Sequence, residues 1–76
     1  MTKIINENER KRIGTRIAEI RKDKGLTQAQ LAEATGLQQA HIARIETGRY
    51  SVGLDTLALI ATALDARIDI IVKSEE

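Results

Sequence analysis

Apolar residues recur at helical intervals along the first third of the chain. Ile13, Ile17 and Ile20 lie three or four residues apart, a spacing that places them on one face of an α-helix. Gly25 follows four charged residues and is typical of a helix end. The pattern therefore predicts a first amphipathic helix over residues 6–24.

Two shorter helices are predicted in the middle of the chain. Thr27 and Gln30 have the spacing of a capping box, and they open a second helix that ends at Gly36. A third helix is predicted from Gln38 until Gly48. The apolar positions that would face a common core are Leu31, Leu37, Ile42 and Ile45.

A fourth helix is predicted after a loop at residues 49–53. Gly53 is an acceptable N-cap, and Asp55 lies in the first turn. The residues expected on its buried side are Leu54, Leu57, Ile60, Ala61 and Leu64.

The hydrophobic period changes from about 3.6 to two near the C-terminus. Residues 66–73 alternate, with Ile68, Ile70 and Val72 on one face, and this predicts a β-strand. A lone strand needs a hydrogen-bonding partner, and residues 3–5 are a weak candidate. We therefore predict that this strand pairs with the same strand of a second chain, which makes its three apolar residues dimerisation residues.

The composition favours a small helical domain. The chain has 76 residues, of which 42% are hydrophobic, but it contains one tyrosine and no phenylalanine or tryptophan. The core must therefore consist of Ile, Leu and Ala. We predict a single all-α domain over residues 1–76, with the helices in residues 6–65 and the dimerisation strand in residues 66–73.

The residues for catalysis or metal binding are missing from the sequence. The chain contains no cysteine and a single histidine, so it offers no thiolate site, no multi-histidine cluster and no nucleophile–base couple. We expect no catalytic residue, no metal and no cofactor. The longest apolar-rich run, residues 57–64, is too short for a membrane span and no apolar leader opens the chain, so we expect a cytoplasmic protein without a membrane partner.

Charge is unevenly distributed, although the net charge is only +1. Residues 1–24 contain eight Lys or Arg against four Asp or Glu, whereas residues 51–76 contain two against five. A basic front half suits a phosphate-facing side, with the acidic tail turned away. Ordinary solvated helix charges would account for the same distribution, so both interpretations stay open here.

The second and third predicted helices have the properties of a helix-turn-helix. Two short helices can cross at about a right angle when the residue at the crossing is small and the turn can adopt unusual dihedral angles. Ala32 supplies the small residue, and Gly36 can adopt the left-handed turn. Glutamine can bond an adenine edge, arginine a guanine edge, and an alanine methyl can contact a thymine methyl. The outward positions of the third helix carry such side chains: Gln38, Gln39, Ala40, His41, Ala43 and Arg44.

The segment from residue 13 to residue 64 resembles the lambda-repressor-like, Xre/Cro-type helix-turn-helix family. The resemblance lies in "IGTRIAEIRKDKGLTQAQLAEATG", "LQQAHIARIETGR" and "LDTLALIATALD". It implies a compact domain of four to five helices and a transcriptional regulator, most simply a repressor. Such a protein would bind double-stranded DNA as a homodimer, in the major groove of palindromic operator half-sites. It would be bacterial or phage-derived and associated with the nucleoid.

The resemblance also implies roles for individual residues. Gln28 would hold a backbone phosphate, and Arg49 would contact the DNA backbone. The alternative for Gln28 is that, like Gln30, it only caps the second helix. Arg21 and Glu46 match an ion pair that ties the first helix to the end of the third. Independently of the resemblance, a lone histidine on an exposed helix face is expected to be a passive surface residue or a neighbour of the phosphates rather than a pH switch, and this applies to His41. The residues that would reach base edges or nearby phosphates are Gln38, Gln39, Ala40 and Arg44.

Two stretches resemble a narrower group, the HipB-like antitoxins. These are "LQQAHIARIE" and "LDARIDIIVK". This resemblance implies an autoregulating antitoxin of a type II toxin–antitoxin pair, with a cognate toxin protein as a partner. The alternative is a helical protein-interaction module that does not read DNA, and the modest net charge is its best argument. Binding to operator DNA that weakens steeply with salt would favour the first hypothesis.

Overall fold

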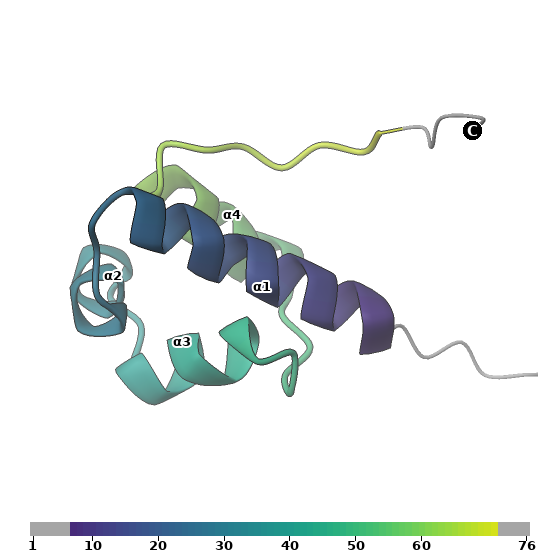
Figure 1. Cartoon of the computed structure of the whole chain (residues 1–76), viewed down its shortest axis with the longest axis horizontal. Helices are drawn as coiled ribbons and strands as arrows, with labels where there is room; N and C mark the ends of the chain where they lie inside the picture. The colour runs from purple at the N-terminus through teal and green to yellow at the C-terminus, as the bar shows by residue number, and fades with distance from the viewer. Residues whose placement is uncertain (1–6, 72–76) are drawn as a thin grey trace, which may run out of the picture.

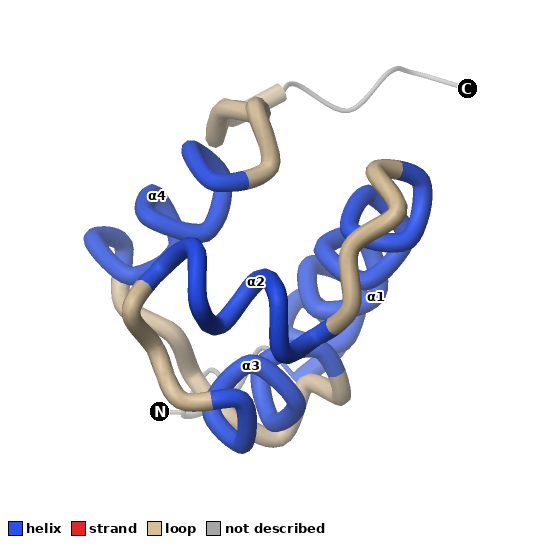
Figure 2. Tube along the Cα trace, turned by 90° about the vertical axis from the view of Figure 1, so that its left-hand side faces the viewer, coloured by secondary structure: helices blue, strands red, loops and turns tan. Residues whose placement is uncertain are grey.

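The computed structural model describes residues 7–71 and contains four helices in this range (Figure 1). Figure 2 shows α2 between α4 and α1, with α3 below it. The predicted all-α architecture is confirmed in its four-helix form. No helix within the described range is long and apolar enough to cross a membrane. The helices are α1 (Glu7–Asp23), α2 (Gln28–Thr35), α3 (Gln39–Glu46) and α4 (Leu54–Ala63).

The start of α2 is the predicted capping box. The Thr27 hydroxyl accepts a hydrogen bond from the Gln30 backbone amide at 3.0 Å, and the Gln30 side chain accepts one from the Thr27 amide at 2.8 Å. Two backbone donors that the helix itself cannot satisfy are thereby satisfied. The local sequence therefore fixes where α2 begins.

The turn between α2 and α3 depends on Gly36, which has a φ of +77°. This left-handed conformation favours glycine, and its amide donates to the Ala32 carbonyl at 2.8 Å. Thr35, just before it, donates its hydroxyl to the Leu31 carbonyl at 2.9 Å and accepts from the Leu37 amide at 3.2 Å. The buried hydroxyl is therefore satisfied, and it helps to close the turn.

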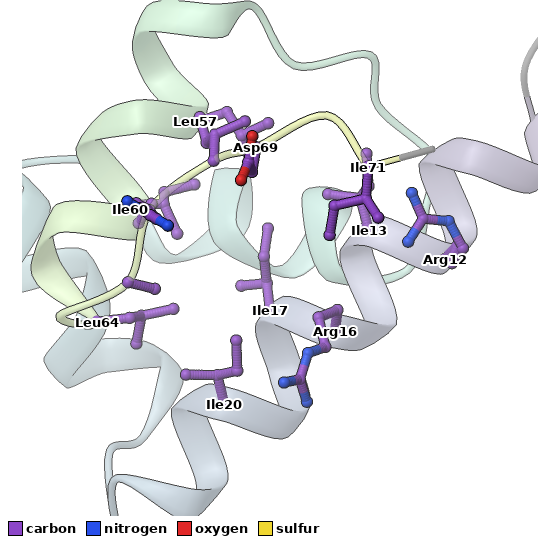
Figure 3. A pocket seen from close by; sticks show the side chains of 14 residues that line it. Arg12, Ile13, Arg16, Ile17, Ile20, Leu57, Ile60, Leu64, Asp69 and Ile71 are labelled. Carbon is purple, nitrogen blue, oxygen red and sulfur yellow. The ribbon is translucent and has the colours of Figure 1, made fainter. Parts of the chain in front are cut away.

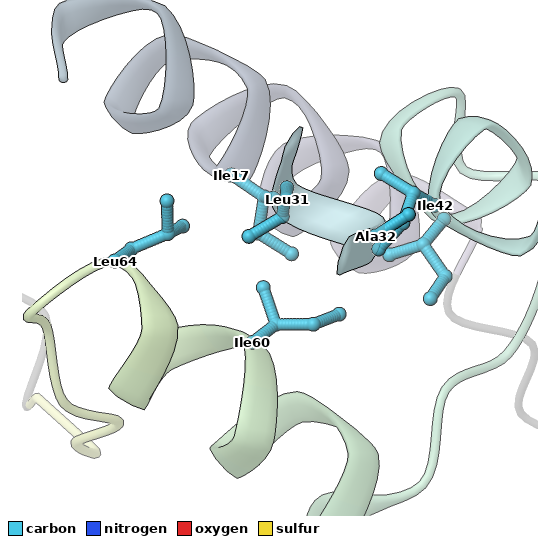
Figure 4. Close-up of a cluster of buried hydrophobic side chains, with 7 residues drawn as sticks. Ile17, Leu31, Ala32, Ile42, Ile60 and Leu64 are labelled. Carbon is cyan, nitrogen blue, oxygen red and sulfur yellow. The ribbon is translucent and has the colours of Figure 1, made fainter. Parts of the chain in front are cut away.

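The core lies where the four helices meet (Figure 4). Most positions expected from the helical periodicity are buried or half-buried, but the prediction for Leu54 is wrong. Leu54 is the first residue of α4 and is 69% exposed, because the buried residues of α4 and its C-cap, Ile60 and Leu64, lie in later turns. The buried apolar side chains are Ile17, Leu31, Ala32, Ile42, Ile45, Ile60 and Leu64.

Gly14 allows α1 and α3 to approach each other closely. A Cβ atom at this position would lie 2.8 Å from the Glu46 carbonyl oxygen and still closer to the carbonyl oxygen of Ile45. Both atoms belong to the backbone at the end of α3, so neither can rotate away. The spacing of these two helices therefore requires glycine at this position.

The predicted C-terminal strand is not seen in the single chain. Residues 66–71 form no strand, and Val72 lies outside the described residues. The Ile70 amide bonds to the carboxylate of its neighbour Asp69 at 2.8 Å, and the Ile70 side chain is 94% exposed. The physical reason is that a ladder needs a second strand, which residues 7–71 do not contain.

Candidate nucleic-acid interface

The outer face of α3 is polar and open, whereas its inner face is buried. Ile42 and Ile45 are almost fully buried against the core. Gln38 is the N-cap, and its side chain makes no capping hydrogen bond. Amide and guanidinium donors are therefore available on this face. Its exposed side chains are Gln38, Gln39, Ala40 and Arg44.

His41 was expected among these open positions, but the structure places it differently. It is half-buried, and its ring meets the ring of Tyr50 edge to face, with centroids 4.9 Å apart and an interplanar angle of 83°. Its Nε2 atom is buried and has no hydrogen-bond partner among the described residues. His41 therefore packs against Tyr50 in the loop after α3, a residue that was not predicted as part of the site. The signal was present, since Tyr50 is the chain's single residue of the Phe, Tyr and Trp types and directly follows Arg49.

The loop after α3 carries Arg49, which is exposed. Its backbone amide donates to the Arg44 carbonyl at 3.0 Å, so the end of α3 fixes its position. On the other side, Arg10 of α1 donates from Nε to the Gly48 carbonyl at 3.4 Å. A Cβ at Gly48 would lie 2.9 Å from the Cα of Lys11. Two basic residues of α1 therefore lie beside this loop, and neither was predicted as part of the site.

Arg21 and Glu46 form a buried, two-pronged ion pair. Arg21 Nε lies 2.6 Å from Glu46 Oε2, and Arg21 Nη2 donates to Glu46 Oε1 at 3.0 Å. A third bond runs from Arg21 Nη1 to the Leu26 carbonyl at 2.7 Å. Hydrogen bonding to Glu46 raises the pKa of Arg21 above its already high ordinary value, so the guanidinium stays charged. One side chain thus joins α1, the approach to α2 and the end of α3.

Gln28, the first residue of α2, is connected to this ion pair. Its Nε2 donates to Glu46 Oε1 at 3.0 Å, and the side chain is part-buried. The resemblance implied a phosphate contact for Gln28 but gave no indication of this bond. Gln30, by contrast, uses its side chain in the capping box. The start of α2 and the end of α3 therefore share one polar network.

A second surface feature is an apolar groove on the other side of α1. Figure 1 shows the segment after α4 and the helix α3 on opposite sides of α1. The groove has a volume of about 310 Å³ and lies between α1, α4 and residues 66–71 (Figure 3). Arg12 and Arg16 line it, and each also forms an exposed ion pair within α1. Its apolar lining includes Ile13, Ile17, Ile20, Leu57, Ile60, Leu64, Ile68 and Ile71.

Residues 7–71 contain no group of three or more His, Cys, Asp or Glu side chains that could hold a metal ion. The chemistry that this part of the chain offers is hydrogen bonding and charge.

Comparison with known proteins points in the same direction. The chain matches the family described as Helix-turn-helix over residues 17–71. It is 44% identical over 63 residues to the immunity repressor protein of Bacillus phage phi105, covering 83% of this chain and 44% of that protein. The chain thus spans less than half the length of that relative.

Two solved structures have a similar fold. The restriction-modification controller protein C.AhdI from Aeromonas hydrophila has a TM-score of 0.77 and 35% identity, covering 79% of this chain and 91% of that one. The restriction-modification controller protein C.Esp1396I, solved as a tetramer with its natural 35 base-pair operator, has a TM-score of 0.71 and 30% identity. That match covers 74% of each chain.

Proposed function

This chain belongs to the helix-turn-helix family, and we propose that it is a sequence-specific DNA-binding transcriptional repressor. The observation that carries the proposal is the division of α3 into a buried apolar face and an open face of short amides, a methyl group and a guanidinium. Those are the groups that read base edges in the major groove. The phage relative is named as an immunity repressor, and C.Esp1396I was solved on its operator.

We assign the residues of this surface to two tasks. Gln39 and Arg44 reach base edges, with Gln38 and Ala40 beside them at the start of α3. Arg49 and Gln28 contact phosphates, one after α3 and the other at the start of α2. His41 contacts Tyr50 and so supports the loop that carries Arg49. Phosphate contacts position the protein on the duplex, and base contacts make the binding specific.

We further propose that the protein acts as a homodimer on a palindromic operator. Two copies would present their α3 helices about 34 Å apart, at successive turns of the duplex. The apolar groove and the segment with Ile68, Ile70 and Ile71 provide the contact surface. Ile70 and Ile71 are 94% and 81% exposed, so a second copy would remove apolar surface from water. This surface lies on the side of α1 away from α3, so dimerisation would leave α3 free (Figure 1).

The test is binding to duplex DNA from the protein's own promoter, with a scrambled duplex of equal length as control. Fluorescence anisotropy should show tighter binding to the promoter, and log affinity should fall linearly with log salt. The alternative function, a protein-interaction module, predicts no binding to either duplex at low salt. Equal binding to both duplexes would instead indicate a non-specific DNA-binding protein.

An antitoxin role with a cognate toxin stays a prediction from the resemblance of two short stretches. The adjacent gene in the source genome provides its test. Co-expression of the two genes should give a complex that survives gel filtration if the neighbour encodes the toxin. A neighbour that encodes no toxin, or a protein that elutes separately, would contradict the antitoxin role and leave the repressor proposal intact.

A further inference from the structure

The Arg21–Glu46 pair does more than connect helices, because one of its oxygens also accepts from Gln28. Glu46 Oε1 receives Arg21 Nη2 and Gln28 Nε2, each at 3.0 Å. Gln28 is half-buried, so part of the residue is accessible while its Nε2 faces the ion pair. The buried network therefore ends at the surface, at the first residue of α2.

The chemistry of a carboxylate decides which end of the Gln28 amide faces inward. An ionised carboxylate can only accept hydrogen bonds, so the amide must present its NH2 group to Glu46. That group has two protons, and Glu46 accepts one of them. The second is left for another acceptor, and a DNA phosphate oxygen is also an acceptor without donors. A single NH2 group can thus lie between two anions and satisfy both.

Arg21 makes this arrangement possible next to a polyanion. An unpaired carboxylate at this depth would be costly, and it would repel an approaching phosphate. Arg21 directs two N–H donors to Glu46 and a third to the Leu26 carbonyl, just before α2. The charge on Glu46 is therefore compensated by Arg21, which reaches both carboxylate oxygens and shares one of them, Oε1, with Gln28.

We propose that Glu46 is a positioning residue for DNA binding, which holds the Gln28 amide so that its second N–H donates to a backbone phosphate. The inference rests on the proposed function, since it concerns how the same surface contacts DNA. It assigns Glu46 a role in affinity for any duplex and none in the choice of sequence.

The variant Glu46→Gln separates positioning from charge. It removes one negative charge, and charge alone would make binding to a polyanion tighter. If Glu46 positions Gln28, binding should instead become weaker. A glutamine at position 46 can present its own NH2 group, so it no longer determines which end of the Gln28 amide faces inward. We expect affinity for promoter and scrambled duplexes to fall about tenfold, the value of one hydrogen bond to a charged group. The matched control is Glu33→Gln, which removes the same charge from an exposed position on α2 and should not weaken binding.

A double-mutant cycle distinguishes positioning from loss of stability. Gln28→Ala should weaken binding about as much as Glu46→Gln. The double variant should bind DNA as tightly as the single variant with the lower affinity, so that the two losses do not add. Circular dichroism at the assay temperature verifies that each variant is folded. If Glu46 only stabilised the fold, Gln28→Ala would have the same effect in both backgrounds.

A measurement on the unmodified protein keeps the proposal testable if Glu46→Gln does not fold. The side-chain NH2 protons of Gln28 should exchange with water more slowly than those of Gln39, which is exposed, and they should shift when a scrambled duplex is added. Equal exchange rates would overturn the proposal, as would a folded Glu46→Gln that binds as tightly as the unmodified protein. If the unmodified protein bound no DNA, the proposed function would fail as well, so the two failures can be told apart.

Discussion

Replacing Gly14 by alanine should destabilise the protein, although alanine is the better helix former. Helix propensity alone favours alanine by about 1 kcal/mol. The added Cβ, however, would lie 2.8 Å from the Glu46 carbonyl oxygen and 2.9 Å from its carbonyl carbon, with the Ile45 oxygen closer still. Forcing a methyl group into such a contact costs about 1–3 kcal/mol, and rigid backbone atoms place this case at the upper end. We expect a net loss of about 2 kcal/mol.

The assay is thermal unfolding followed by far-ultraviolet circular dichroism at one fixed protein concentration. A loss of about 2 kcal/mol in a domain of this size lowers Tm by roughly 8–16 °C. Gly53→Ala is the matched control, because a Cβ at Gly53 meets nothing within 4 Å. Its cost at the N-cap of α4 should stay below about 1 kcal/mol. A Gly14→Ala protein that is as stable as the parent, or more stable, would refute the steric reasoning.

Three further substitutions test other parts of the molecule. Gln39→Ala should weaken binding to the promoter duplex by about 1–3 kcal/mol and leave binding to scrambled DNA nearly unchanged; equal losses on both would identify a phosphate contact. Ile70→Lys should shift the protein towards monomer in analytical ultracentrifugation without altering the fold, since this side chain is 94% exposed, and an unchanged mass would contradict the proposed dimer surface. Thr27→Ala should lower the free energy of unfolding in urea by about 1 kcal/mol through loss of the capping box, whereas no change would mean that water replaces it.

Much of the fold could be predicted because its signals are local. The capping box spans Thr27 to Gln30, and the turn requires a residue that can adopt a positive φ, which is Gly36. A few adjacent residues therefore define where α2 begins and ends. Helical periodicity then identified most of the core. The prediction that Leu54 is buried was wrong because periodicity identifies a face of a helix. It does not say which turns of that helix have a neighbour to pack against.

The rest depends on distances between residues far apart in the sequence. Gln28 and Glu46 are 18 positions apart, and no spacing rule predicts that their side chains touch. Gly14 lies inside a helix, where sequence reasoning treats glycine as unfavourable, and only the approach of α3 explains it. The strand expected to contain Ile70 is not seen in the single chain for a related reason, since alternation describes a residue pattern and cannot supply the second strand.

The position of the groove on the far side of α1 limits how a bound molecule could control operator occupancy. A ligand or protein in the groove would leave α3 uncovered, so it could not compete with DNA for the same surface (Figure 1). In the proposed homodimer it would act by changing the fraction of chains that are paired, and that fraction depends on total protein concentration. The effect of such a regulator on operator occupancy would then be largest when the protein concentration is near the dissociation constant of the dimer, and small at concentrations far above it. The expression level of the protein would set how strongly such a regulator acts.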